Sequence, residues 1–422
     1  MEVLLKKATD EKLNLPGVDQ NCLASCSPRS YPQVIKYMGS KATLLEFIGR
    51  GLGELHKPGQ TIVDLFAGAC AISGGFGQLA PIVSNDIQSY SATIASIYLR
   101  PANKIGAFDI VELARPLAEA KFAALPDDLA YSGDRSLDEF NQIEKRNREL
   151  LKADLPFEYH LFTKFYSGTW WSAEQCVWID SIRQVLDELL SRGDILQSDF
   201  QFGLTCLMHA MAYTSQGTGH YAQYRDAKDE SSMLDISKYR RQTVQSYFSR
   251  KFETLLNWNL LNAVDLGHQL VSMDYRDCLS NVKRSVVYAD PPYAFVHYSR
   301  FYHAIETLVK YDYPDLQFRG SDVVKGRYRV DRHQSPFCIS TQVNSAFSQM
   351  FEGLKESEND LLLSYSNTGM IDIDELIGLA TDAFGSRYQV WVENIDYTHM
   401  TMGRRNDRTR EVKESLILAK RR

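Results

Sequence analysis

The tetrapeptide Asp290-Pro291-Pro292-Tyr293 has the residue types needed to act on a weakly nucleophilic amine, and it directly follows the apolar stretch that ends at 290. In an exocyclic amino group of a nucleobase the lone pair is delocalised into the ring. The Asp290 carboxylate and the Pro291 carbonyl can each accept one hydrogen of such a group and favour a pyramidal, nucleophilic nitrogen. The proline rings fix φ and remove N–H donors, although Pro-Pro can also simply end a strand. Tyr293 offers a flat face for a flipped-out base, so we predict that all four residues are catalytic.

A second group of residues, DLFAGACAISGGF (64–76), has the composition of a ligand-binding turn. Gly68 allows the backbone to approach a ligand closely, and Phe66 can pack against that ligand. Asp86 follows Asp64 by 22 positions, where a dinucleotide-type fold places a carboxylate that binds ribose hydroxyls. The turn is not GxGxxG, which argues against a nicotinamide or flavin cofactor. Glycine-rich turns also serve for packing, and Asp86 could instead cap a helix.

Short apolar stretches rich in β-branched residues must position both groups, and they are typical of buried strands. Ser40 is expected to cap a helix before TIVDLF (61–66), and PIVSND (81–86) follows the glycine-rich turn. A strand, a tight turn, a helix and a strand that ends in aspartate begin a doubly wound α/β sheet. Further strands are predicted at 285–290, 361–366, 388–395 and 414–420, the last two joined as an antiparallel hairpin by a basic loop at 396–413.

The middle of the chain has a different pattern, with long charged helical stretches such as 137–152. An amphipathic helix is predicted at 174–192, where Ser172 and Gln175 form a capping box and Gly193 ends the helix. We therefore predict a mainly helical insert within the α/β unit. The predicted divisions are an N-terminal leader at 1–30, a domain formed by 31–105 and 262–422, and the helical insert at 106–261.

The composition is that of a globular protein. Of the 422 residues, 44% are hydrophobic and 24% charged, and the net charge is −6, which argues against a mostly disordered chain. No window approaches the ~18 consecutive apolar residues of a membrane helix, and residues 1–30 lack the apolar region of a signal peptide. The seven cysteines form no CxxC pair, so we expect reduced thiols, no metal and no membrane partner in a cytoplasmic protein.

Four motifs in a fixed order, IKYMGSK (35–41), DLFAG (64–68), ND (85–86) and DPPY (290–293), resemble those of the DNA adenine-N6 methyltransferases of the alpha group. The resemblance implies a Rossmann-like, S-adenosylmethionine-dependent methyltransferase fold interrupted by a target-recognition insert. It also implies base flipping in double-stranded DNA and methyl transfer to N6 of adenine. Enzymes of this family commonly work beside a restriction endonuclease or in phage defence.

The resemblance also implies roles for single residues of the cofactor site. The N-terminal block supplies an aromatic residue and a lysine, the FxG turn holds the methionine part, the acid after the second strand holds the ribose, and the block before DPPY contacts the adenine. The cofactor-binding residues implied are Tyr37, Lys41, Asp64, Phe66, Gly68, Asp86, Asp274, Tyr275 and Asp290. Lys41 could instead be an exposed helix residue, and Asp274 could cap a turn. Cys70 departs from the family pattern FxGxG, and its side chain could crowd the methionine tail.

Basic, aromatic stretches at 213–251 and 325–333 are the predicted DNA contacts. The predicted DNA-binding residues are Arg225, Arg240, Arg241, Lys325, Arg327 and Arg329. A solvated charged loop is the alternative for each stretch. Tyr298 and Tyr302, just after DPPY, would suit base stacking but could equally fill the core.

Two other functions are compatible with these residues. Cytosine-N4 methylation uses the same amine chemistry, but its enzymes more often have serine in place of the first aspartate of DPPY. A catalytically silent DNA-binding protein could keep the fold, although the intact Asp290 and Asp86 argue against it. The recognition sequence and the oligomeric state are not predicted.

Overall fold

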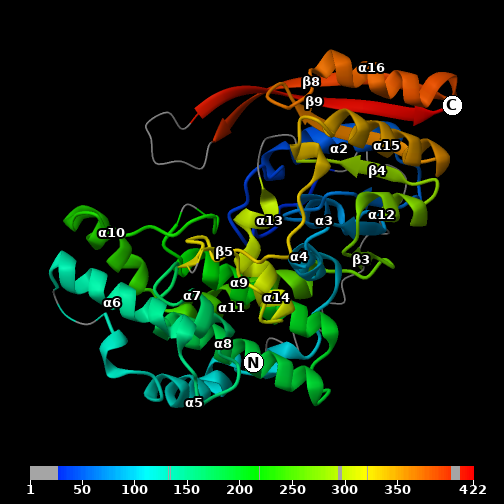
Figure 1. Cartoon of the computed structure of the whole chain (residues 1–422). Helices are drawn as coiled ribbons and strands as arrows, with labels where there is room; N and C mark the ends of the chain where they lie inside the picture. The colour runs from blue at the N-terminus through cyan, green and yellow to red at the C-terminus, as the bar shows by residue number, and fades with distance from the viewer. Residues whose placement is uncertain are drawn as a thin grey trace.

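The computed structural model contains a seven-stranded sheet with helices on both faces (Figure 1). The described residues are 27–131, 133, 135–217, 219–292, 297–320, 322–400 and 409–422. The strand order is β3-β2-β1-β4-β7-β9-β8. The strands are β1 Ile62–Asp64, β2 Ile82–Asn85, β3 Gln269–Val271, β4 Val286–Ala289, β7 Asp360–Ser366, β8 Tyr388–Met400 and β9 Thr409–Arg421.

The strands from β3 to β7 run parallel, whereas β9 runs antiparallel to both β7 and β8. The inner parallel strands are buried along their whole length, which explains their continuous apolar sequences. β2 and β4 lie on opposite sides of β1, so the direction of strand addition reverses there. Ligands of open α/β sheets bind at the carboxyl ends of the strands beside such a reversal. The predicted α/β fold with a C-terminal antiparallel hairpin is confirmed.

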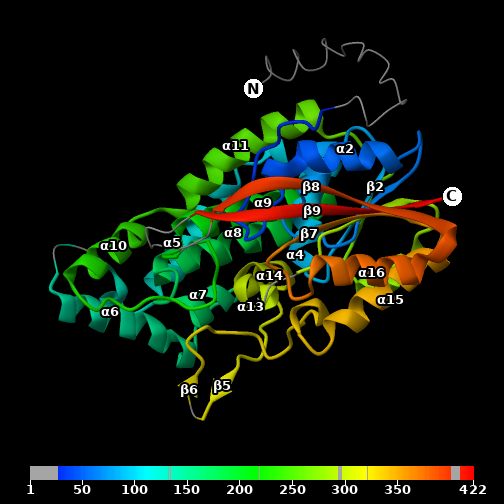
Figure 2. The same ribbon diagram turned by 90° about the horizontal axis from the view of Figure 1, so that it is seen from above.

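Two hydrophobic cores cover the two faces of the sheet (Figure 2). Leu362 of β7 belongs to one core, while its neighbours Leu361 and Leu363 belong to the other, as the alternation of side chains along a strand requires. The helices of the first face are α2 Leu45–Leu55, α3 Ala71–Phe76, α4 Ser89–Leu99 and α14 His303–Lys310. Those of the second face are α12 Tyr275–Asn281, α15 Val343–Glu356 and α16 Ile373–Phe384.

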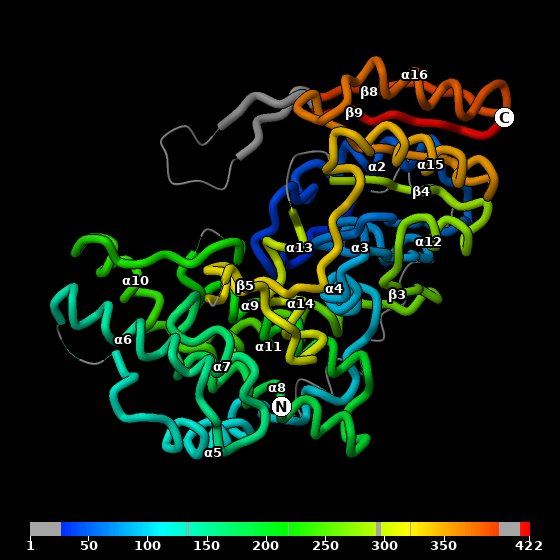
Figure 3. The backbone as a smooth tube through the Cα atoms, viewed as in Figure 1, coloured from blue at the N-terminus to red at the C-terminus, as the bar shows by residue number. Residues whose placement is uncertain are grey.

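A group of helices lies between α4 and β3 in the sequence and forms the lower part of the molecule in Figure 1; Figure 3 traces the chain into and out of it. These helices are α5 Ile110–Ala123, α6 Leu137–Glu149, α7 Leu161–Tyr166, α8 Ala173–Ser191, α9 Gln197–Thr214, α10 Glu230–Arg240 and α11 Val244–Asn262. Since α9 and α11 pack against α4, their buried residues continue the first core of the sheet. The helical segment and the sheet therefore share one core.

The helix α8 begins with the predicted capping box. The Ser172 hydroxyl accepts the Gln175 N–H at 3.2 Å, and the Gln175 side chain accepts the Ser172 N–H at 2.9 Å. The prediction for Ser40 is wrong, because a short 3₁₀ turn from Ala42 precedes α2 and its cap position is Lys41. The remaining elements are η2 Ala42–Leu44, η3 Ile105–Ala107, η4 Asp127–Leu129, η5 Leu150–Lys152, η6 Pro336–Cys338, η7 Gly385–Arg387, α13 Tyr298–Phe301, β5 Phe318–Arg319 and β6 Asp322–Val323.

Two strand predictions needed correction. The C-terminal hairpin is longer than expected, since β8 and β9 extend into the predicted loop at 396–413. Backbone pairing in a two-stranded ribbon does not require alternating apolar residues. The apolar pattern therefore ended before the strands did. The edge strand β3 was not predicted, because it has three residues and no buried position. No helix among the described residues has the length and apolar character of a membrane span, and most of the predicted leader, residues 1–26, lies outside the described part.

Candidate active site

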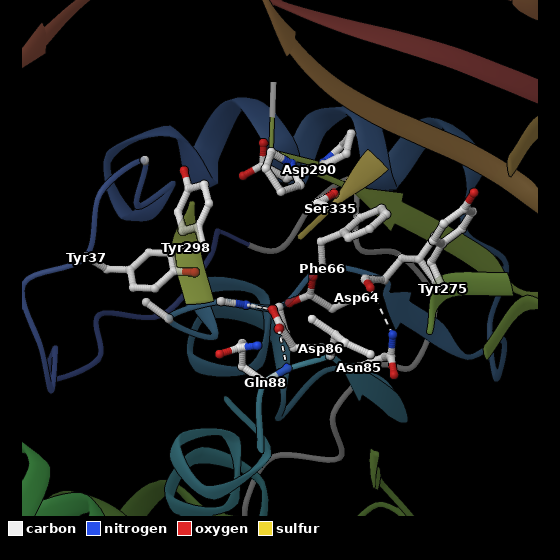
Figure 4. Close-up of a pocket in the computed structure, with 18 of the residues that line it drawn as sticks. Tyr37, Asp64, Phe66, Asn85, Asp86, Gln88, Tyr275, Asp290, Tyr298 and Ser335 are labelled. Atoms are coloured by element: carbon white, nitrogen blue, oxygen red, sulfur yellow. Dashed lines mark hydrogen bonds between the residues drawn. The ribbon is translucent and has the colours of Figure 1, made fainter. Parts of the chain in front are cut away.

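A cavity of about 1130 Å³, part of it open to solvent, lies at the carboxyl ends of β1, β2 and β4 (Figure 4). Tyr293 lies outside the described residues. Every other predicted catalytic and cofactor-binding residue lines this cavity: Tyr37, Lys41, Asp64, Phe66, Gly68, Asp86, Asp274, Tyr275, Asp290, Pro291 and Pro292. The parallel register explains the convergence, because Asp64 pairs with Ser84 on one side and with Tyr288 on the other.

The turn after β1 is held in place by Asp86. Gly68 has a left-handed backbone with φ 50° and donates its N–H to Asp86 Oδ2 at 2.9 Å. The Gln88 N–H donates to Asp86 Oδ1 at 2.8 Å in the turn before α4, whose cap position is Gln88, so Asp86 is not the cap of that helix. A Cβ at Gly68 would lie 2.8 Å from the Tyr37 ring, which makes glycine necessary here. Burial raises the pKa of Asp86 to about 6, although these N–H groups favour the carboxylate.

Cys70 takes the place of the second family glycine without narrowing the cavity. Its backbone has φ 63°, in the left-handed region, at the start of α3. Its fully buried thiol donates to the carbonyl oxygen of Ser91 in α4 at 3.2 Å. The side chain therefore lies in the core between the two helices, and the expected crowding of the cavity does not occur.

Asp64 presents an unsatisfied acceptor to the cavity. The residue is 2% exposed, and its Oδ1 has no hydrogen-bond partner among the described residues. Burial, followed by the charges of Asp290 and Asp86, raises the pKa of Asp64 well above its usual range. An unpaired buried acceptor costs ~1–3 kcal/mol, which a donor on a ligand would recover. S-adenosylmethionine has a sulfonium, an ammonium and ribose hydroxyls, so it fits a cavity lined by several carboxyl groups.

An aromatic wall closes another side of the cavity (Figure 4). The Phe66 and Tyr275 ring centres are 5.9 Å apart, and both rings contact Phe337. Such a wall suits the flat face of an adenine. Asp274 caps α12 by accepting the Arg276 N–H at 3.0 Å and pairs with the Arg276 guanidinium at 2.8 Å. Asp274 thus has the capping role and also borders the cavity.

The tyrosines near the cavity differ in burial. Tyr37 stacks on Tyr302 with ring centres 4.6 Å apart. Tyr302 is 1% exposed, and its hydroxyl accepts the Met38 N–H at 2.8 Å, so Tyr302 belongs to the core. Tyr298 is half-buried and lines the cavity beside Tyr37. Of the two tyrosines considered for base stacking, Tyr298 has the suitable position.

Asp290 pairs with a buried lysine. The Lys41 Nζ lies 2.9 Å from Asp290 Oδ1 and 3.3 Å from Glu414 Oε1. Lys41 is 6% exposed, so it is not an exposed helix residue. Burial raises the pKa of Asp290 to about 6; the charge of Lys41 opposes this increase and that of Glu414 adds to it. The ammonium of Lys41 thus contacts the predicted catalytic carboxylate, and its contact with the cofactor stays a prediction.

Known proteins are similar to this chain in sequence. Residues 37–166 match the family model described as D12 class N6 adenine-specific DNA methyltransferase. The resemblance to the adenine-N6 methyltransferases is confirmed. The matched segment contains the N-terminal block, the FxG turn and Asp86, and it continues into the helical insert.

Curated relatives extend the similarity over most of the chain. Modification methylase LlaI of Lactococcus lactis subsp. lactis is 24% identical over 346 residues, which are 82% of this chain and 48% of LlaI. The type II methyltransferase M.FokI of Planomicrobium okeanokoites is 22% identical over 350 residues, which are 81% of this chain and 46% of M.FokI. The type II methyltransferase M.NlaIII of Neisseria lactamica is 19% identical, with 81% of this chain and 86% of M.NlaIII covered. The chain thus spans about half the length of LlaI and of M.FokI.

One predicted DNA contact of this methyltransferase-like chain, Arg240, is buried inside the helical insert. Its guanidinium is 0% exposed and pairs with Glu144 at 2.8 Å. It also donates to the carbonyl oxygens of Trp170 and Thr169. The prediction is wrong for Arg240, because the adjacency of two arginines in a sequence does not determine which side of a helix each occupies. Its neighbour Arg241 is exposed.

Arg327 and Arg329 are also buried, at 6% and 5% exposure. Arg329 pairs with Asp312 at 2.6 Å. A phosphate contact is therefore wrong for both residues, since tertiary packing withdraws them from solvent. The other predicted contacts are more exposed: Arg225 pairs with Asp235, and Lys325 pairs with Asp226. DNA binding by Arg225, Arg241 and Lys325 stays a prediction.

Two histidines and two arginines in or near the cavity wall were not among the predicted contacts. His297 and His333 line the cavity. Burial, followed by the charges of Arg332 and Arg300, lowers the pKa of His297, so these groups lie near one another. The two guanidinium groups lie 4.5 and 5.6 Å from the centre of the Tyr328 ring, and neither forms a salt bridge with a described residue. The sequence indicated a DNA-binding role for Arg332 and His333 only through their membership of the basic stretch at 325–333.

Asn85 is a further residue whose role was not anticipated. Its side-chain N–H donates to the Leu65 carbonyl at 3.0 Å, and its Oδ1 accepts the Met273 N–H at 3.2 Å. Asn85 therefore ties the segments after β1 and β3 together below the cavity. The ND dipeptide (85–86) could have indicated a role for Asn85, but a function was assigned from the sequence to Asp86 alone.

Proposed function

We propose that this chain is a site-specific adenine DNA methyltransferase, which transfers a methyl group from S-adenosylmethionine to the N6 amino group of adenine in double-stranded DNA. The observation that carries the proposal is that Asp290, Pro291 and Pro292 share one cavity with Asp64 and Asp86. An amine-accepting turn and a crevice suited to a cationic nucleoside therefore meet at one edge of the sheet.

The reaction requires a more nucleophilic amine and stabilisation of the positive charge that develops on it. In this proposal, Asp290 accepts one hydrogen of the amine and the Pro291 carbonyl accepts the other. S-adenosylmethionine would supply the methyl group: the methyl–sulfur bond would break as the methyl–nitrogen bond forms, a neutral thioether would leave, and the methylated amine would release one proton. As the nitrogen becomes positive, the Asp290 carboxylate stabilises it, and a donor or acceptor of this kind in a desolvated site contributes about 2.7–4 kcal/mol.

Other residues of the cavity hold the two reactants. Asp86 accepts hydrogen bonds from ribose hydroxyls, and the unpartnered Oδ1 of Asp64 accepts from the ammonium. Phe66 and Tyr275 contact the adenine of the cofactor. Tyr298 stacks on the flipped base from DNA, together with Tyr293 in the DPPY motif. Except for Tyr293, which lies outside the described residues, each contact follows from the chemistry of the side chain and its place around the cavity.

Adenine is favoured over cytosine as the target because the family match is to N6 adenine-specific enzymes and because DPPY begins with aspartate. We further propose that the helical insert 106–261 recognises the target sequence. Arg300 and Arg332, whose charges act on His297 in the cavity wall, would contact phosphates, and such contacts orient a duplex without reading its sequence. Since LlaI is named a modification methylase and M.FokI a type II methyltransferase, we propose that the chain acts beside a restriction endonuclease.

Replacement of Asp290 tests the proposal. Wild type and Asp290→Ala are incubated with tritiated S-adenosylmethionine and plasmid DNA, and the product is examined by long-read sequencing. The loss of Asp290 should lower the rate by ~10²–10³, whereas Asp382→Ala, at an exposed carboxylate of α16, should retain it. Near-wild-type methylation by Asp290→Ala would refute the proposal. Methylated cytosine in the wild-type product would show that the target is the N4 amino group of cytosine and not the N6 amino group of adenine.

A further inference from the structure

We propose that Glu414 is a positioning residue for methyl transfer: by sharing Lys41 with Asp290, it keeps the Asp290 carboxylate a strong acceptor for the target amine. This inference rests on the proposed function. Glu414 lies on β9, far from DPPY in the sequence, and none of the four motifs contains it.

The contacts define a row of three charges, carboxylate–ammonium–carboxylate. The Lys41 Nζ lies between Asp290 Oδ1 at 2.9 Å and Glu414 Oε1 at 3.3 Å. The Ser364 hydroxyl donates to the same Glu414 oxygen at 2.9 Å, and this bond fixes the carboxylate from the neighbouring strand β7. Lys41 is 6% exposed and Glu414 is 3% exposed, so solvent screens these charges weakly.

Such a row is not explained by stability alone. Burying three charged groups is costly, and apolar residues of similar volume at such positions often give an equal or more stable fold. Apart from Ser415, the buried residues that follow Glu414 on β9 are apolar, with Leu416, Ile417 and Leu418 fully buried. A carboxylate at the start of this apolar run, in contact with Lys41, therefore suggests a role in the chemistry.

The electrostatic reason follows from the charge balance. With Asp290 as its sole partner, Lys41 would neutralise the carboxylate and make it a weaker acceptor. With two carboxylates, the row has a net charge of −1, and the Asp290 oxygens stay basic. The pKa of Asp290 reflects this balance: burial raises it to about 6, Lys41 lowers it and Glu414 raises it. The other ionisable groups that face Asp290 are Asp64 and Tyr288, each with a pKa raised chiefly by burial.

Removal of the Glu414 charge has a predicted sign. The isosteric variant Glu414→Gln takes away a group that raises the pKa of Asp290, so this pKa should fall. Because the reaction needs the ionised form of Asp290, the wild-type rate should decline below about pH 6, and this decline is the acid limb of the pH profile. In Glu414→Gln the acid limb should lie at least about half a pH unit lower. On the alkaline plateau, the single-turnover rate should also drop, by up to about threefold for each half unit by which the pKa of Asp290 falls, since the carboxylate is then a weaker acceptor.

The experiment compares single-turnover methylation of a DNA duplex from pH 5 to 8 by wild type, Glu414→Gln and a matched control. Glu393→Gln removes a carboxylate from the adjacent strand β8, opposite Leu416, and should change neither the plateau nor the acid limb. Cofactor affinity, measured by calorimetry, should change less than about twofold in Glu414→Gln. If this variant does not fold, Glu414→Asp keeps the charge, and its acid limb should stay near that of wild type.

Three results would overturn the inference. One is a pH–rate profile of Glu414→Gln whose plateau and acid limb equal those of wild type. Another is a lower rate with an unmoved limb and weaker cofactor binding, which would indicate a structural role. The third is an acid limb in Glu414→Asp that has shifted downward. A wild-type protein that methylates no DNA would instead refute the proposed function itself.

Discussion

Replacement of Arg240 by alanine should destabilise the helical insert and leave intrinsic DNA affinity unchanged. The guanidinium donates to Glu144 at 2.8 and 3.0 Å, to the Trp170 carbonyl at 2.8 Å and to the Thr169 carbonyl at 2.7 Å. Alanine would leave the Glu144 charge and both carbonyls buried without these partners. Breaking a buried ion pair by removing one partner costs about 3–5 kcal/mol.

That loss is large compared with the ~5–15 kcal/mol net stability of a folded protein. With a slope of about 3 kcal/mol per molar urea, the unfolding midpoint should fall by ~1–1.7 M. Tryptophan fluorescence is a suitable signal, because Trp170 and Trp171 are fully buried in the same region. Arg241→Ala is the matched control, since Arg241 is exposed and such a surface change should stay within about 0.5 kcal/mol.

A second variant separates the ion pair from the side chain itself. Arg240→Met combined with Glu144→Leu removes both charges, and apolar replacement of a buried pair is often neutral or stabilising by about 1–4 kcal/mol. The double variant should therefore recover most of the midpoint. The reasoning would be refuted if Arg240→Ala had the midpoint of the Arg241→Ala control and a weaker DNA affinity, because Arg240 would then contact phosphate.

Two further predictions address the two binding reactions. Asp86→Ala should weaken S-adenosylmethionine binding by about 1.5–3 kcal/mol, the contribution of hydrogen bonds to a charged group. Calorimetry measures this affinity, and an unchanged value would show that Asp86 does not bind the ribose. Replacing Arg300 and Arg332 together by serine should weaken binding to all DNA sequences alike and flatten the log–log salt dependence by about 0.9 for each phosphate that is no longer neutralised. Fluorescence anisotropy at several salt concentrations measures this slope, and a slope equal to that of wild type would exclude both arginines from the DNA surface.

Local signals in the sequence were sufficient for the sheet and for the cavity. The strands that end at Asp64 and Asn85 are short, apolar and followed by turn residues, and the parallel register then brings Asp64, Asp86 and Asp290 to one edge. The capping box at Ser172 was visible because both of its members lie within one turn. These features depend on neighbours in the sequence and on the general rule for ligand sites in α/β sheets.

Features that depend on distant packing were not visible. Arg240 and Arg241 are adjacent in the sequence, yet one is buried against Glu144 and the other is exposed. The partner of Lys41 on β9 could not be inferred, because Glu414 meets Lys41 only after the hairpin has paired with β7. A charged residue in a sequence does not indicate whether its partner will be solvent, a phosphate or a carboxylate far along the chain.

In the proposed function, the separation of charges would allow a chain with a net charge of −6 to bind a polyanion. The carboxyl groups of Asp64, Asp86 and Asp290 line the cavity, where weak screening strengthens their attraction for a cationic cofactor. The cationic groups of Arg300 and Arg332 lie near His297, which lines the same cavity. At physiological salt, charges near the solvent are screened beyond about 8 Å, so a phosphate beside these guanidinium groups would interact chiefly with them. It follows that the interior carboxylates should control cofactor affinity, whereas Arg300 and Arg332 should control DNA affinity and its salt dependence.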